Sequence, residues 1–121
     1  MTVPEGGGTE TMEFLVEIDI AVPADLPVEE RERRYADEAA QGARLAADGV
    51  IQRIWRVPGT ANNIGVWAAS DASELHGHLA SLPLFEFMTI RVRPLARHPL
   101  EAPDQHERGP ARRKEDREHY R

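Results

Sequence analysis

The stretch SLPLFEFMTIRV, residues 81–92, changes its hydrophobic period halfway along and thereby decides the fold. The leucines that lead into it recur at helical spacing, at Leu75, Leu79 and Leu82. The apolar residues that end it recur at every second position, the period of a strand, at Met88, Ile90 and Val92. Pro83 lies between the two patterns and cannot continue a helix, so the change of period has a physical cause. The stretch predicts a helix that ends near Leu82 and a strand over residues 87–93.

Outward from this junction, the same reasoning predicts three more strands and one more helix. The predicted strands are alternating or short apolar runs bounded by turn residues, and they cover residues 14–20, 51–57 and 64–69. A helix is predicted over residues 28–48, where Gly49 ends it. Asp71, with Glu74 three residues later, is typical of the start of the second helix. The element order is therefore β-α-β-β-α-β.

This order is typical of a ferredoxin-like α+β fold, in which an antiparallel sheet carries both helices on one face. The other face stays uncovered in so short a chain. The sequence predicts apolar or mixed side chains on that face, among them Leu15, Ile54 and Trp67. Because exposed apolar patches mark association surfaces, we expect two or more copies to associate through this face as a dimeric α+β barrel. A monomer with a polar open face is the alternative.

Composition excludes several classes of function. The chain has 121 residues, enough for one domain with a modest core, and its formal net charge of −6 disfavours binding to nucleic acid. The absence of cysteine removes disulfides, thiolate metal sites and cysteine nucleophiles. No apolar run reaches the roughly 18–20 residues that span a bilayer, and the N-terminus does not resemble a secretory signal. We therefore expect a cytoplasmic protein.

Composition also divides the chain into three parts. Residues 1–11 are rich in glycine and predict a flexible leader. Residues 12–99 contain all the predicted elements and form the folded domain. Residues 100–121 mix charges of both signs with very few apolar side chains, so they predict a disordered tail.

Several short motifs are spread over residues 12–99. The most specific is the junction with its exit, residues 81–99. The others are weaker when taken singly: Phe14-Leu15-Val16, the Pro-x-Asp-x-Pro loop at residues 23–27, Trp55-Arg56-Val57 with Gly59, Asn63, and Glu74-Leu75-His76. Together they resemble the muconolactone Δ-isomerase family. The resemblance implies an isomerase of aromatic hydrocarbon catabolism that moves a double bond within a small unsaturated lactone, without a metal or an organic cofactor.

The implied reaction removes a proton from one carbon and returns it to another, so it needs an acid–base group and donors for the lactone and carboxylate oxygens. Glu38 is the candidate catalytic proton carrier, since it lies where the family pattern has a glutamate. It also lies at the edge of the apolar face of the first helix, which is centred on Tyr35. Partial burial there would raise its pKa towards a useful range. The alternative is a solvated carboxylate.

Arg56 and Asn63 are candidate substrate-binding residues. Arg56 follows Trp55 in a predicted strand, where an inward guanidinium can clamp a carboxylate in a fork. Asn63 enters the next strand, where its amide can donate to a carbonyl oxygen. The alternatives are a salt bridge for Arg56 and a turn-forming role for Asn63.

The two histidines of the second helix are separate candidates, because residues two apart on a helix point in different directions and do not chelate one metal. His76 matches a family histidine and is a candidate catalytic residue, with a surface position as the alternative. His78 is not a histidine in the family pattern. It lies with the leucines of the helix, where a buried polar tip needs a partner, so it is a candidate substrate-binding residue of an altered pocket. No metal site is predicted.

Two positions depart from the family pattern. Ala61 and Ile64 stand where the family often has tyrosines, which implies a larger, more apolar pocket with fewer hydroxyl donors. The departures leave two alternatives to a muconolactone-like substrate. One is a related isomerisation or cyclisation of a bulkier secondary metabolite, and the other is small-molecule binding without catalysis.

Overall fold

The computed structural model describes residues 10–101. The elements follow the predicted order: β1 (Met12–Ile20), α2 (Val28–Ala47), β2 (Ile51–Arg56), β3 (Asn63–Ala69), α3 (Ala72–Ala80) and β4 (Met88–Leu95). A short 3₁₀ helix, η1 (Phe85–Phe87), directly precedes β4. Nearly all of the predicted leader and tail lies outside the described residues.

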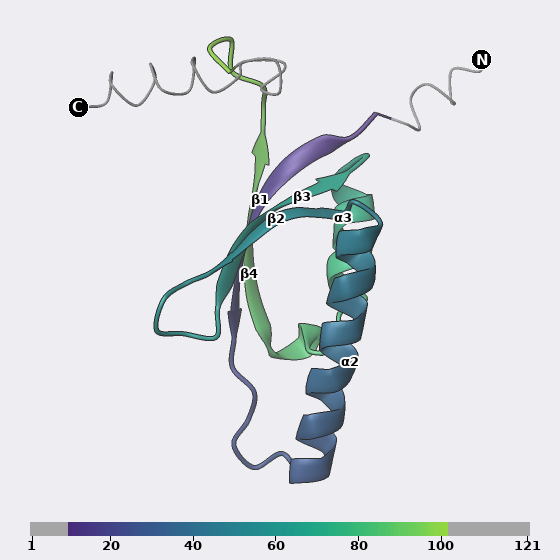
Figure 1. The fold of residues 1–121 in the computed structure, drawn as a ribbon, viewed down its shortest axis with the longest axis vertical. Helices are drawn as coiled ribbons and strands as arrows, with labels where there is room; N and C mark the ends of the chain where they lie inside the picture. Colours follow the sequence, from purple (N-terminus) through teal and green to yellow (C-terminus); the bar gives the residue numbers. More distant parts are fainter. Residues whose placement is uncertain (1–9, 102–121) are drawn as a thin grey trace, which may run out of the picture.

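The sheet has the strand order β2-β3-β1-β4, and all neighbouring strands are antiparallel. Figure 1 shows α2 and α3 on the same side of this sheet. The ferredoxin-like arrangement predicted from the sequence is therefore confirmed. The predicted start of α3 is also present: the side chain of Asp71 accepts a hydrogen bond from the backbone N–H of Glu74 at 2.8 Å.

The hydrophobic core lies between the sheet and the two helices. Strand β1 contributes every second residue to it, and Phe14, Val16 and Ile18 are each at most 2% exposed. The helices and the turn after α3 contribute leucines: Leu45, Leu75, Leu79 and Leu82. Glu13, Leu15, Glu17 and Asp19 of β1 alternate with these residues and belong to the uncovered face, where Leu15 lies half-buried, as predicted.

The predictions that place Trp67 and Ile54 on the uncovered face are wrong. Trp67 pairs with Phe14, so both side chains lie on the helix side of the sheet, where Trp67 is 1% exposed. Ile54 pairs with Gly65, which pairs with Val16, so it also belongs to the helix side, half exposed on the edge strand. Strand β3 carries apolar residues on both faces, and its alternation therefore does not reveal which face is inward.

Two connections meet at the C-terminal end of β1. The loop between β2 and β3 is held there by Asn62, whose Oδ1 accepts a hydrogen bond from the N–H of Ile20 at 3.0 Å. The turn between α3 and β4 is held by the N–H of Ala21, which donates to the carbonyl oxygen of Phe87 at 3.0 Å. Because β3 and β4 flank β1, the loop and the turn lie on opposite sides of the strand end.

Candidate active site

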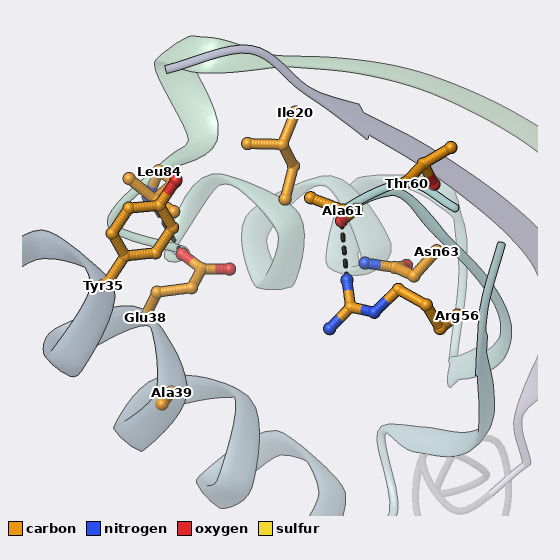
Figure 2. A pocket seen from close by; sticks show the side chains of 9 residues that line it. All are labelled: Ile20, Tyr35, Glu38, Ala39, Arg56, Thr60, Ala61, Asn63 and Leu84. Atoms are coloured by element: carbon orange, nitrogen blue, oxygen red, sulfur yellow. Dashed lines mark hydrogen bonds between the residues drawn. The ribbon is translucent and has the colours of Figure 1, made fainter. Parts of the chain in front are cut away.

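A cavity of about 560 Å³ lies between α2 and the end of the sheet where these two connections meet (Figure 2). The lining residues are Ile20, Tyr35, Glu38, Ala39, Arg56, Thr60, Ala61, Asn63 and Leu84. They come from the ends of three strands, one face of α2, the β2–β3 loop and the turn after α3. The structure thus brings three of the five predicted site residues into one cavity: Glu38, Arg56 and Asn63.

Glu38 enters the cavity from α2, where it is half-buried. Its Oε1 accepts a hydrogen bond from the backbone N–H of Leu84 at 2.9 Å. Figure 2 shows the other carboxylate oxygen directed into the cavity. Burial raises the pKa of Glu38 above its ordinary value, and the Leu84 hydrogen bond offsets part of this rise. A carboxyl group with a raised pKa and an unengaged oxygen is suited to taking up and returning a proton.

Arg56 ends β2 and lies directly opposite Asn63 in β3. Its Nη1 donates a hydrogen bond to the carbonyl oxygen of Ala61 at 2.6 Å. Figure 2 shows the guanidinium reaching into the cavity from the side opposite Glu38. Within residues 10–101 the ion pairs do not involve Arg56, so its remaining N–H groups are not committed to a carboxylate of the fold.

Asn63 begins β3, and its side chain is half-buried. Figure 2 shows its amide nitrogen directed towards the cavity, and its Oδ1 is buried without a hydrogen-bond partner among the described residues. The turn before β3 depends instead on Asn62, whose side chain bonds Ile20 and whose N–H donates to Thr60 Oγ1 at 2.9 Å. A half-buried amide that the turn does not use is available to bind a ligand.

Tyr35 lines the cavity beside Glu38 and Leu84 (Figure 2), although sequence reasoning assigned it no role in the site. Its side chain is 45% exposed, so a ligand in the cavity can reach the phenol. The spacing contained the signal, because residues three apart on a helix share a face and Tyr35 precedes Glu38 by three.

His76 and His78 are not among the lining residues of this cavity. His76 is exposed on α3 and packs edge-on against Phe85, with the ring centroids 6.0 Å apart. His78 is half-buried on the same helix. Hydrogen bonds from Ser70 lower the pKa of Glu74, and the interaction with His78 lowers it to a smaller extent. The catalytic role of His76 and the binding role of His78 stay predictions.

Ala61 and Ile64, the two departures noted in the sequence, lie on different surfaces. Ala61 borders the cavity and presents only a methyl group to it. Ile64 pairs with Glu17 in β1 and with Trp55 in β2, on the uncovered face of the sheet. The expectation that Ile64 enlarges the pocket is therefore wrong, because the register of β3 directs it away from the cavity.

No group of three or more His, Cys, Asp or Glu side chains within residues 10–101 is placed to hold a metal ion. No helix in the same range is long and apolar enough to cross a membrane.

Comparisons with known proteins agree on one family. A family model described as muconolactone delta-isomerase matches residues 12–101. Muconolactone Delta-isomerase 1 of Acinetobacter lwoffii is 41% identical over 88 residues, which are 73% of this chain and 92% of that protein. Muconolactone Delta-isomerase of Rhodococcus opacus is 39% identical over 85 residues, 70% of this chain and 91% of that protein. A crystal structure of muconolactone isomerase aligns with a TM-score of 0.72 and 32% identity, and covers 78% of this chain and 98% of that one.

Proposed function

Because this chain belongs to the muconolactone delta-isomerase family, we propose that it is an isomerase that moves a double bond within muconolactone, or a closely related unsaturated lactone, by proton transfer. The family model and the relatives confirm the family membership that the sequence motifs predicted. The observation that carries the proposal is the convergence of Glu38, Arg56 and Asn63 on one cavity.

The chemistry needs a single proton carrier. In an unsaturated lactone, removal of a proton from the carbon beside the double bond gives a dienolate, whose negative charge spreads onto the carbonyl oxygen. Return of a proton at the carbon beside the carbonyl group moves the double bond and leaves atoms and electrons balanced. The enzyme must therefore supply an acid–base group and donors that stabilise the oxygen where charge develops.

The cavity offers a residue for each of these tasks. The free oxygen of Glu38 takes the proton and returns it. Arg56 binds the substrate carboxylate through its uncommitted N–H groups, as a charge-assisted pair. The amide of Asn63 and the phenol of Tyr35 are the donors available to the lactone oxygens. The Leu84 hydrogen bond stabilises the ionised form of Glu38 between turnovers.

The test is Glu38→Gln, assayed by ultraviolet absorbance of the lactone and by deuterium uptake from heavy water. Glutamine keeps an oxygen that accepts the Leu84 N–H but cannot carry the proton. Turnover should fall by roughly 10²–10⁴-fold, with substrate binding little changed. Arg56→Ala should mainly weaken binding, because the carboxylate loses its partner. Asp37→Asn, an exposed neighbour on the same helix, is the matched control. Full turnover by Glu38→Gln would end this assignment.

A bulkier lactone is the second candidate substrate, favoured by the small side chains of the cavity wall. Ala39, Thr60 and Ala61 all border the cavity, whose volume of about 560 Å³ lies in the range of roughly 300–1,000 Å³ typical of ligand pockets. The same assay, run on lactones with added alkyl groups, decides between the two. Ala61→Phe should then reduce turnover of the larger lactones more than that of muconolactone. A lactone that binds without turnover would favour a binding protein.

The proposal includes self-association through the uncovered face of the sheet. That face carries the half-buried Leu15 and Val66, and Trp55 is 46% exposed on it. Contact with a second copy would remove this apolar surface from water. The cytoplasmic location predicted from the sequence stays a prediction.

A further inference from the structure

The Leu84 N–H that bonds Glu38 belongs to the turn of residues 83–87, and Arg34 contacts that turn at three places. Its Nη1 donates to Glu86 Oε2 at 3.1 Å and reaches the carbonyl oxygen of Pro83 at 3.5 Å. Its guanidinium also lies over the ring of Phe87, 5.2 Å from the centroid. The contacted residues thus lie on both sides of Leu84 in the sequence.

Arg34 belongs to α2, and a hydrogen bond within the helix orients its guanidinium group. Its Nη2 donates to Glu30 Oε2 at 3.1 Å, one helical turn earlier. Glu38 lies one helical turn later, so the two residues that contact the turn come from neighbouring positions on one face of α2. Arg34 therefore joins the helix that carries Glu38 to the turn that supplies its hydrogen-bond donor.

The turn has little freedom once it is held in this way. Leu84 is 1% exposed, and its carbonyl oxygen accepts the N–H of Phe87 at 2.8 Å. Its N–H is consequently fixed in direction relative to α2. A bond of 2.9 Å to one oxygen of Glu38 leaves only the other oxygen for the cavity.

We propose that Arg34 is a positioning residue for Glu38: by fastening the turn of residues 83–87 to α2, it keeps the Leu84 N–H on one carboxylate oxygen and leaves the other oxygen facing the cavity. The geometric claim stands by itself, and only its catalytic consequence rests on the proposed function. Arg34 is not among the residues that line the cavity, so it acts through Leu84 and Glu38.

The proposal has a consequence for the titration of Glu38. A hydrogen bond to the ionised carboxylate lowers its pKa, so a loosened turn should raise that pKa. The titratable or charged groups around Glu38 are Tyr35 and Arg34 on its own helix, Arg56 across the cavity, and Glu86 in the turn. Removing the negative charge of Glu86 would by itself lower the pKa of Glu38. Glu86→Ala therefore sets the two effects against each other, because it also removes the ion pair, at 3.1 Å the shorter of the two hydrogen bonds from Arg34 to the turn.

The experiment follows the Glu38 carboxyl carbon and the Leu84 amide proton by NMR during a pH titration of the full chain without substrate. In the wild type, the Leu84 amide should titrate together with Glu38. In Glu86→Ala and Arg34→Ala, the Glu38 midpoint should rise and the Leu84 amide should no longer follow it. The rise in Arg34→Ala should reach at least the roughly 0.5–1 pH unit of one lost hydrogen bond, and the rise in Glu86→Ala should be smaller because the lost negative charge opposes it. Glu30→Ala removes a carboxylate from the helix side of Arg34 only, so the Leu84 coupling should persist.

A lower or unchanged midpoint in Glu86→Ala, with the Leu84 amide still coupled, would overturn the proposal. Circular dichroism at each pH separates a folded variant from an unfolded one, and Arg34→Lys serves as the milder variant, which keeps the charge but not the several simultaneous contacts. The kcat/KM profile is a second readout: its acidic limb should move to higher pH with the Glu38 midpoint. If Glu38→Gln retains turnover, the proposed role of Glu38 fails while the NMR result stands; if the wild type turns over no lactone, the proposed function fails and the NMR result again stands, so the failures are distinguishable.

Discussion

Glu38 combines two influences that act in opposite directions on one carboxyl group. Burial between α2 and the cavity raises its pKa, and the hydrogen bond from Leu84 lowers it. Burial has the larger effect, so the folded chain binds the Glu38 proton more tightly than the unfolded chain does. A group of this kind favours the folded state when it is protonated and disfavours it when it is ionised. Its usefulness as a proton carrier therefore has a cost in stability at neutral pH.

Glu38→Gln should accordingly stabilise the protein in a pH-dependent way. Below about pH 4, the carboxyl group is protonated in both the folded and the unfolded chain, so the substitution should make little difference. As pH rises through the raised pKa, the wild type loses this stability and the glutamine variant does not. The midpoint of thermal unfolding, measured from pH 3.5 to 7.5, should diverge between the two proteins. Parallel curves, as expected for the exposed Asp37→Asn control, would contradict the prediction.

At the scale of elements, the close approach of β2 to β3 positions Arg56 opposite Asn63. A Cβ atom added at Gly65 would lie 2.5 Å from the carbonyl oxygen of Arg53, a backbone atom that cannot move without shifting the strand. The pairing also shifts register between Ile51 and Arg53. Glycine at position 65 therefore lets the edge strand lie close enough for Arg56 to reach the cavity.

Gly65→Ala should destabilise the fold by about 1–3 kcal/mol, because the edge strand must move to accept the methyl group. Gly77→Ala is the matched control: it lies inside α3 with nothing within 4 Å of the added Cβ. This change should stabilise the protein by about 0.5–1 kcal/mol, since alanine loses less backbone entropy in a helix. Urea unfolding measures both values. Equal stabilities for the two variants would show that β3 does not need its glycine.

The elements also show what the sequence could and could not predict. Changes of hydrophobic period at Pro83 and turn residues such as Gly49 and Pro58 are local signals, so the order of helices and strands was predictable. The inward face of β3 was not, because its residues are apolar on both sides and only pairing with Phe14 decides that Trp67 is inward. Face and register are set by long-range contacts, which alternation within one strand does not contain.

The candidate site was predictable where the motifs of one family supplied positions. Glu38, Arg56 and Asn63 do share a cavity. Their roles in it are tested by the activity of the variants proposed above. Tyr35 was missed because an aromatic residue on an inner helix face is most often a core residue. The contacts between Arg34 and the turn could not be predicted either, since Glu86 lies 52 residues from Arg34 in the sequence.

On the scale of the whole molecule, the two faces of the sheet differ in what covers them. The helix side contains the core and the cavity, whereas the other side carries mixed apolar and charged side chains that the described residues do not cover. Trp55 is prominent there, with the guanidinium of Arg53 4.9 Å from its ring centroid. An aromatic ring stacked by arginine and still half exposed is a typical anchor of a protein interface.

Light scattering of the wild type should therefore show a multiple of the 13.6 kDa chain mass. Trp55→Glu should shift the protein towards the monomer, because it introduces a charge where the proposed assembly would bury apolar surface. Val28→Glu makes the same change at a residue that is 64% exposed at the start of α2, and it should leave the mass unchanged. A wild-type monomer in dilute solution would contradict the assembly.

The end of β1 links the two walls of the cavity through consecutive residues. The amide of Ile20 is bonded by the β2–β3 loop, and the next amide, that of Ala21, is bonded by the turn that carries Leu84. A displacement of either wall therefore passes through a single residue, Ile20, to the other. Thermal fluctuations of the cavity mouth should be concerted, so that the wall with Arg56 and the wall with Glu38 move towards and away from each other together. An enclosed substrate would damp both walls at once, although it touches each through different atoms.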